Sequence, residues 1–339
     1  MEYKQIGKSD LEVSKICIGA WQWGGQWGEY DIKEIEKIID IAIEKGVNFL
    51  DTAEGYGESE NVVGKVLEGK RDKFILATKI GGNNFDYKTA KEHLEKSLKR
   101  LKTDYVDLYQ IHWPKMKHLW HKEDMSEKDY EDITESMIKL KKEGLIRWAG
   151  VSNFRAHHLK NFPNEAFSVI ISNQVPYSIL WRCYDFDGTT DFCKEKGITY
   201  LAYSPLAEGI LTGRFNKKTE IKEGIRKNNI LFTEPIFSKA LQSIEKLKEI
   251  AEEKGMSLSQ LSIRWTAEKE IVSSSIVGAR KSHHFAENVE SFNFKLEKEI
   301  IEKINRISEK FQKENLVPTL ELWVSNCLKK DLEKIGIKK

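Results

Sequence analysis

The sequence predicts an α/β fold in which eight parallel strands, each followed by a helical segment, close into a (β/α)8 TIM barrel. Short apolar stretches alternate with amphipathic ones along the chain, which is the pattern of strands covered by helices. A length of 339 residues accommodates one such barrel, since barrels of about 250 residues with insertions fold as single units. No linker rich in Pro, Gly or Ser marks a boundary. We therefore expect a single domain over residues 1–339, with a core at about 1–295 and a helical C-terminal extension over about 296–339.

The alternative architecture is a doubly wound nucleotide-binding domain followed by a second domain. Such a domain carries a G-x-G-x-x-G turn directly after its first strand. The chain has no such turn after its first predicted strand, so the closed barrel is favoured.

The chain opens with a predicted hairpin that turns around Gly7-Lys8-Ser9-Asp10. Eight strand-like stretches follow, each short and rich in β-branched or aromatic residues. They are apolar more than alternating, which is typical of strands buried on both faces. The predicted strands are Lys15–Gly19, Val47–Asp51, Phe74–Lys79, Val106–His112, Arg147–Ser152, Val169–Gln174, Thr199–Ser204 and Ser274–Val277.

Amphipathic helical stretches lie between these strands. One apolar stripe consists of Ile32, Ile35, Ile38, Ile39, Ala42 and Ile43, and another of Leu94, Leu98 and Leu101. Gly46, Gly144 and Gly197 follow helical stretches at the position where a left-handed cap residue is common.

Charge is abundant but balanced, with 55 Lys and Arg against 53 Asp and Glu and a formal net charge of +2. A nucleic-acid partner is not expected, because such binders present a face of one sign to the phosphates. No apolar run approaches the ~20 residues that a membrane span requires. Residues 1–5 lack a basic flank leading into an apolar stretch, so we expect no signal peptide and a cytoplasmic location.

Polar residues end the predicted strands, and the carboxyl ends of the strands form the active face of a barrel. Each of these residues closes a strand that is otherwise apolar, so one common rim would collect them all. They are Asp51, Lys79, His112, Ser152, Asn153, Gln174, Tyr203 and Ser204.

Asp51, Lys79 and His112 end the second, third and fourth strands, and Tyr56 lies in the loop after Asp51. The pKa of a free tyrosine is about 10, and a nearby ammonium lowers it by stabilising tyrosinate. We therefore expect Lys79 to lower the pKa of Tyr56 and make it a proton donor, with His112 polarising a carbonyl. The alternative is purely structural: Lys79 would simply pair with Asp51, and His112 would be a core residue. Four such residues at one rim make this alternative less favoured.

The segment Gly46–Gly57 reads G-V-N-F-L-D-T-A-E-G-Y-G, and Thr78-Lys79 and Tyr109-Gln110-Ile111-His112-Trp113-Pro114 follow in order. In combination and spacing these motifs resemble the aldo-keto reductase superfamily from Tyr3 to about Asn288. The resemblance implies a catalytic tetrad of Asp51, Tyr56, Lys79 and His112, with Tyr56 as general acid and base.

The resemblance also implies a nicotinamide cofactor, with NADP(H) preferred and NAD(H) possible, bound without a Rossmann fold. Arg280 would reach a 2′-phosphate through a charge-assisted contact. Val277 and Gly278-Ala279 replace the Pro and the Lys-Ser pair of many relatives, which leaves the choice between the two cofactors open. The cofactor residues that the resemblance implies are Trp21, Asp51, Ser152, Asn153, Gln174, Tyr203, Ser204, Leu206, Gly209, Leu211, Gly278, Arg280, His284, Glu287 and Asn288.

The loop after the first strand carries three tryptophans, and aromatic faces suit sugars, steroids or aryl aldehydes alike. We expect a substrate pocket lined by Trp21, Trp23, Trp27, Tyr56, His112 and Trp113. The expected partner is a small-molecule carbonyl or alcohol substrate, and the oligomeric state is left open.

The leading hypothesis is an NADP-dependent oxidoreductase that reduces an aldehyde or ketone, with a sugar or aryl aldehyde among the candidates. The rival is a cofactor-binding regulatory or scaffold protein, since Val175–Arg182 resembles the branch that contains bacterial general reductases and potassium-channel β-subunits.

A metal-dependent barrel hydrolase is the third possibility. His118 and His121 lie near Glu123 but lack an H-E-x-x-H arrangement, so we expect a solvated loop and no metal. In the C-terminal extension, Pro318 is well placed to begin a last helix.

Overall fold

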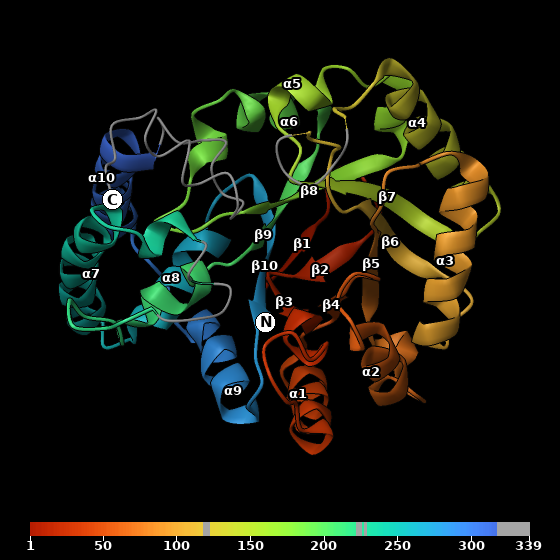
Figure 1. The fold of residues 1–339 in the computed structure, drawn as a ribbon. Coiled ribbons are helices and arrows are strands. Elements are labelled where there is room, and N and C mark those ends of the chain that lie inside the picture. Colours follow the sequence, from red (N-terminus) through yellow and green to blue (C-terminus); the bar gives the residue numbers. More distant parts are fainter. Residues whose placement is uncertain (118–122, 222–225, 227–228, 317–339) are drawn as a thin grey trace.

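Eight parallel strands form a closed barrel in the computed structural model, which describes residues 1–117, 123–221, 226 and 229–316. Around the barrel the strands follow one another in chain order, and the last strand pairs with the first (Figure 1). All eight predicted strands are confirmed. They are β3 (Ile16–Gly19), β4 (Phe49–Asp51), β5 (Ile75–Ile80), β6 (Val106–Ile111), β7 (Ile146–Ser152), β8 (Ile170–Pro176), β9 (Thr199–Tyr203) and β10 (Val272–Gly278).

The predicted hairpin is also present and closes one end of the barrel. Strands β1 (Tyr3–Gln5) and β2 (Glu12–Ser14) pair antiparallel, and in Figure 1 they lie in the middle of the ring of strands. Ile6, Leu11 and Val13 of this hairpin are fully buried in one apolar cluster with inward-facing residues of the barrel strands. Because the hairpin fills the end where the strands begin, the opposite end is the one left to hold a site.

Helices surround the barrel and cover it with a second apolar layer. Their apolar stripes face the strands, as in the first helix, where Asp31 caps the start and Gly46 ends it in the left-handed conformation. The helices are α1 (Ile32–Lys45), α2 (Ser59–Val66), α3 (Tyr87–Leu101), α4 (Glu127–Lys142), α5 (Ala156–Leu159), α6 (Thr189–Lys196), α7 (Ile236–Glu253), α8 (Leu258–Ala267), α9 (Ser282–Glu290) and α10 (Lys298–Phe311). Within the described chain, no helix combines the length and apolar character that crossing a bilayer requires.

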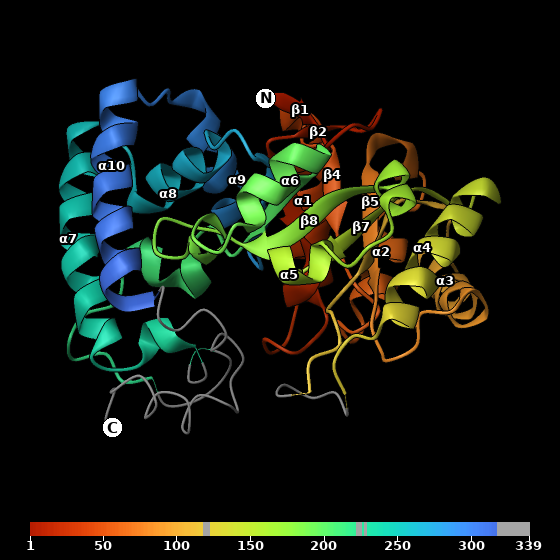
Figure 2. The ribbon, with the colours of Figure 1, turned by 90° about the horizontal axis from the view of Figure 1, so that it is seen from above.

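The C-terminal extension begins with α10, which packs side by side with α7 (Figure 2). One π-helical turn, Gln312–Leu316, follows it. The helix predicted from Pro318 lies outside the described residues.

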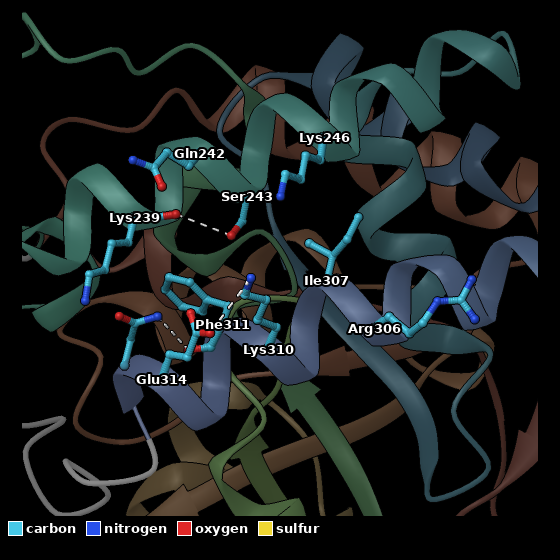
Figure 3. A pocket seen from close by; sticks show the side chains of 10 residues that line it. Lys239, Gln242, Ser243, Lys246, Arg306, Ile307, Lys310, Phe311 and Glu314 are labelled. Atoms are coloured by element: carbon cyan, nitrogen blue, oxygen red, sulfur yellow. Dashed lines mark hydrogen bonds and ion pairs between the residues drawn. The ribbon is translucent and has the colours of Figure 1, made fainter.

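A groove of about 380 Å³ opens between α7 and α10 (Figure 3). None of the residues predicted to form the functional site line this groove. The lining residues are Lys239, Gln242, Ser243, Lys246, Arg306, Ile307, Lys310, Phe311, Glu314 and Asn315.

The strand β4 begins two residues later than predicted, and the side chain of Asn48, just before it, binds the hairpin. Its Oδ1 accepts from the Ser14 amide at 2.7 Å, and its Nδ2 donates to the Glu12 carbonyl at 3.0 Å. Asn48 therefore ties the hairpin to the barrel.

We expect Asn48→Ala to lower the free energy of unfolding by about 1–2 kcal/mol, since two hydrogen bonds to the hairpin backbone are lost, one partly buried and one exposed. Chemical denaturation measures the difference. Asn61→Ala is the matched control, because Asn61 binds only the exposed Glu58 carboxylate, and it should change stability by less than about 0.5 kcal/mol. Equal effects of the two variants would show that Asn48 does not hold the hairpin.

Candidate active site

Asp51, Tyr56, Lys79 and His112 meet at the open end of the barrel. Asp51 ends β4, Lys79 lies near the end of β5, and His112 directly follows β6. The Lys79 ammonium lies 2.5 Å from Asp51 Oδ1 and 3.4 Å from the Tyr56 hydroxyl. On its other side, this hydroxyl lies 3.4 Å from His112 Nε2. The tyrosine oxygen is thus placed between an ammonium and an imidazole.

The loop that carries Tyr56 is held against the segment after β3. A Cβ on Gly24 would lie 1.7 Å from the Tyr56 carbonyl oxygen, and one on Gly57 would lie 2.4 Å from the Gly24 carbonyl oxygen. Gly57 also has a φ of +57°, which favours glycine. Both glycines are therefore required for the close approach that fixes the Tyr56 backbone.

Lys79 is fully buried and makes three polar contacts. Besides Asp51 and Tyr56, its ammonium donates to the Thr52 carbonyl at 2.8 Å. Burial by itself lowers the pKa of Lys79, but the Asp51 carboxylate and the Tyr56 hydroxyl outweigh burial, so this pKa is raised. Lys79 is consequently a permanent positive charge beneath the tyrosine hydroxyl.

The pKa of Tyr56 corrects one expectation from the sequence. Burial raises this pKa above its ordinary value, and the nearby Lys79 ammonium reverses only part of that rise. The expected lowering is wrong because the cost of desolvating tyrosinate exceeds the attraction of one ammonium. Tyr56 is therefore a protonated hydroxyl at neutral pH, ready to donate.

The pKa of His112 is also shifted by its surroundings. Burial, followed by the Lys79 charge, lowers its pKa well below the usual range. The imidazole is therefore neutral at pH 7. A neutral ring at this place offers a hydrogen bond without adding a second positive charge.

The second oxygen of Asp51 binds two glutamines that come from other strands. Gln110 Nε2 donates to Asp51 Oδ2 at 3.1 Å, and Gln174 Nε2 donates to the same atom at 2.8 Å. Gln174 was expected at the rim, whereas Gln110 was not singled out. The signal for Gln110 was present, because it is a polar residue inside an otherwise apolar stretch of β6.

Ser152, Asn153 and Tyr203 form a second polar group next to His112. Asn153 Nδ2 donates to the His112 carbonyl at 3.1 Å and to Ser152 Oγ at 3.0 Å. The Tyr203 hydroxyl donates to Asn153 Oδ1 at 2.8 Å. Asn153 itself has a φ of +66°, a strained conformation that often accompanies functional sites. These three expected cofactor residues are thus adjacent to the group formed by Asp51, Tyr56, Lys79 and His112.

The segment after β9 is a loop with an unusual backbone. Ser204, Ala207, Glu208 and Gly209 all have positive φ, and a short helical stretch, η5 (Ala207–Thr212), contains the last three of them. Backbone amides exposed by such conformations form concave sites for anions. Of the expected residues here, Leu206 is half-buried, whereas Leu211 is fully buried and offers a ligand only its backbone.

Three arginines converge near this loop. A Cβ on Gly209 would lie 3.3 Å from Arg214 Nη2 and 3.7 Å from Arg226 Nη2. Arg280 Nη1 donates to the Trp27 carbonyl at 2.8 Å, and the Arg226 guanidinium lies 5.5 Å from the Trp27 ring. Burial, then Arg214, lowers the pKa of Arg226, and the Arg280 charge adds to this effect.

Arg214 and Arg226 are not among the residues expected in the site, although Arg214 lies three positions after the expected cofactor residue Leu211. Trp27 Nε1 is a buried donor without a partner among the described residues. Three guanidinium groups near one loop, with the Glu208 carboxylate beside Arg226, leave a local excess of positive charge that favours an anionic ligand.

The remaining expected cofactor residues lie around the end of β10. Gly278 is exposed, and a Cβ there would contact the Gln22 side-chain amide at 3.0 Å. His284, Glu287 and Asn288 lie on α9, the first two exposed and the third buried.

The tryptophans of the loop after β3 divide into two groups. Trp21 lies against the Tyr56 ring with centroids 5.8 Å apart, and Trp27 packs edge-on against Trp21 at 5.1 Å. Trp23 is fully buried, and its indole N–H donates to the Ala279 carbonyl. The assignment of Trp23 to the substrate pocket is therefore wrong, because its whole surface is covered by the protein core. Trp113 is half-buried next to His112.

No group of three or more His, Cys, Asp and Glu side chains is arranged to hold a metal ion in the part of the chain that the structure describes. His118 and His121 lie outside that part.

The profile of the aldo/keto reductase family matches residues 15–309 of the chain. The aldo-keto reductase YhdN of Bacillus subtilis (strain 168) is 33% identical over 324 residues, which cover 91% of this chain and 94% of YhdN. A probable voltage-gated potassium channel subunit beta of Oryza sativa subsp. japonica is 29% identical, covering 91% of this chain and 96% of that protein.

Among solved structures, the glycerol dehydrogenase AKR11B4 of Gluconobacter oxydans superimposes with a TM-score of 0.77 at 27% identity, covering 93% of this chain and 96% of that one. The thermostable aldo-keto reductase Tm1743 in complex with the inhibitor epalrestat has a TM-score of 0.72 at 29% identity, covering 91% of this chain and all of that one. These findings confirm the resemblance on which the sequence-based expectations rest, including the branch that joins bacterial reductases and channel subunits. The chain belongs to the aldo/keto reductase family.

Proposed function

We propose that the protein reduces an aldehyde or ketone to an alcohol, with Tyr56 as the proton donor and NADPH as the preferred cofactor. Family membership supports an oxidoreductase. The observation that supports the finer proposal best is the place of the Tyr56 hydroxyl, 3.4 Å from both the Lys79 ammonium and His112 Nε2. A carbonyl oxygen that binds there meets an acidic proton and a neutral imidazole together.

In this proposal each residue of the tetrad has a separate task. Tyr56 donates its proton to the carbonyl oxygen while a bound nicotinamide supplies the hydride. The Lys79 ammonium stabilises the tyrosinate that forms, and Asp51 keeps Lys79 charged and in place. The neutral His112 ring orients the carbonyl without competing as a cation.

The residues present fit a nicotinamide dinucleotide. Ser152, Asn153 and Gln174 offer the amide and hydroxyl groups that a carboxamide requires, beside the tetrad. The loop after β9, with its run of positive φ angles, and the arginines near it would hold the phosphates. Arg280 is exposed and uses Nη1 for the Trp27 carbonyl, so its other donors remain to bind a 2′-phosphate.

A cofactor-binding regulatory protein is the second candidate, and the match to potassium-channel beta subunits favours it. The complete tetrad argues for the enzyme. We further propose that the protein acts in the cytoplasm on a small carbonyl or alcohol. Tight nucleotide binding without turnover of sugars, aryl aldehydes, dicarbonyls or glycerol, together with a stably recovered protein partner, would favour the regulatory role.

Tyr56→Phe should lower kcat for carbonyl reduction by about 10²–10⁴-fold, because the proton donor is lost while the ring remains. The dissociation constant of NADPH, measured by fluorescence, should change by less than about twofold. Tyr30→Phe is the control, since Tyr30 is exposed and lies outside the tetrad. Reduction by Tyr56→Phe at a rate near that of the wild type would remove Tyr56 from the role of acid.

Arg280→Ala should raise the KM for NADPH by about 10- to 100-fold and leave the KM for NADH within about twofold, because one charge-assisted contact to the 2′-phosphate disappears. Steady-state kinetics with both cofactors checks this. Lys281→Ala, which removes an exposed charge next along the chain, is the control. A proportional loss with both cofactors would assign Arg280 to another part of the cofactor.

The rate of reduction should not change with pH between about pH 6 and about pH 9, because the lowered pKa of His112 lies below this range and the raised pKa of Tyr56 lies above it. Burial raises the pKa of Tyr56, so its hydroxyl keeps the proton through mildly alkaline pH. Burial lowers the pKa of His112, so its ring stays neutral at mildly acid pH. A kcat that falls with a midpoint near 6.5 or near 8 would contradict these protonation states.

A further inference from the structure

The Asp51 carboxylate is bound on both of its oxygens by other side chains. Oδ1 accepts from the Lys79 ammonium, and Oδ2 accepts from the side-chain amides of Gln110 and Gln174. Asp51 is only 2% exposed, so solvent contributes little to holding its charge. A buried carboxylate depends on such donors, because each unfilled oxygen retains the cost of desolvation.

Gln110 reaches Asp51 because of its register in the barrel. It lies opposite Lys79 of β5 and opposite Gly150 of β7, so its side chain points to the barrel interior as Lys79 does. A Cβ on Gly150 would lie 3.1 Å from Gln110 Cγ, so the glycine leaves the room that the glutamine side chain occupies. Gln110 is fully buried there.

The orientation of the Gln110 amide is determined by its two neighbours. Its Oε1 accepts from Gln174 Nε2 at 3.4 Å, which leaves its Nε2 to face Asp51. The reverse orientation would place an oxygen against the carboxylate. Gln110 can therefore act on Asp51 only as a donor.

We propose that Gln110 is a positioning residue of the reaction. Its amide holds the Asp51 carboxylate in the orientation in which Oδ1 faces Lys79, and so it keeps the Lys79 ammonium beneath the Tyr56 hydroxyl. Without this donor, Oδ2 keeps the Gln174 amide of its two amide donors, and the carboxylate is held less firmly against rotation. Lys79 then follows either the moved carboxylate or its second acceptor, the Thr52 carbonyl. The inference rests on the proposed function, since the step that it supports is proton donation by Tyr56.

The test uses Gln110→Met, which keeps the length of the side chain and removes the donor. Ser172→Ala is the matched control, because Ser172 is also buried beside Gly150 but its hydroxyl has no partner among the described residues. Gln110→Met should lower kcat about tenfold, with KM for the carbonyl and for NADPH within about twofold. Its kcat should also begin to fall at a lower alkaline pH than in the wild type, because Lys79 loses part of the interaction that keeps it protonated. Ser172→Ala should show neither change.

The variant Gln110→Glu tells whether Gln110 positions Asp51 or only fills space in the barrel interior. At neutral pH its carboxylate would repel Asp51, and kcat should fall further than in Gln110→Met. At lower pH the new carboxyl group gains a proton, donates to Oδ2 and should restore part of the rate. A loss of rate that does not depend on pH, or one equal to that of Ser172→Ala, would overturn the proposal.

Crystal structures of the wild type and Gln110→Met give an answer that does not depend on turnover. A rotated Asp51 carboxylate and a lengthened distance from Oδ1 to Lys79 Nζ would support the proposal, whereas an unchanged pair would overturn it. A wild type that turns over no carbonyl would contradict the proposed function instead, and the crystal structures would still decide what Gln110 does to Asp51.

Discussion

The buried ion pair between Lys79 and Asp51 is the interaction on which the candidate site depends. Both side chains are almost completely removed from water, and an isolated charge at such a place is too costly to persist. Directed hydrogen bonds offset this cost on both sides of the pair. The Thr52 carbonyl accepts from the ammonium, and two glutamine amides donate to the carboxylate. Strands β4, β5, β6 and β8 each supply part of this network, so closure of the barrel is what assembles it.

The two ends of the barrel have different tasks. At the end where the strands begin, the hairpin fills the opening with Ile6, Leu11 and Val13. At the end where they finish, glycines bring loops close together, as Gly24 and Gly57 do below Tyr56. Strained backbone is found at Asn153 and in the loop after β9, both at this second end. The apolar plug therefore lies at one end and the candidate site at the other, as is usual for this architecture.

Much of this arrangement is predictable from the sequence, because short apolar strands ending in polar residues specify both the barrel and its rim. All eight strands and the grouping of Asp51, Tyr56, Lys79 and His112 follow from that pattern. The direction in which a side chain points, and how far it is desolvated, do not follow from that pattern. Trp23 turns into the core while Trp21 and Trp27 do not, and the pattern of three nearby tryptophans cannot separate them. Burial outweighs the charge of Lys79 at Tyr56 because desolvation depends on the surrounding packing. Gln110 and Arg226 act across the barrel or between loops, at places that local sequence does not bring together.

Trp27 connects two regions of the site that would bind different molecules. Its ring packs on Trp21, which covers Tyr56, while its carbonyl binds Arg280 and its ring faces Arg226. A molecule that shifted these tryptophans would also change which donors Arg280 and Arg226 have available. By thermodynamic linkage such an effect would be reciprocal, so occupancy near the arginines would change affinity near Trp21 by the same factor.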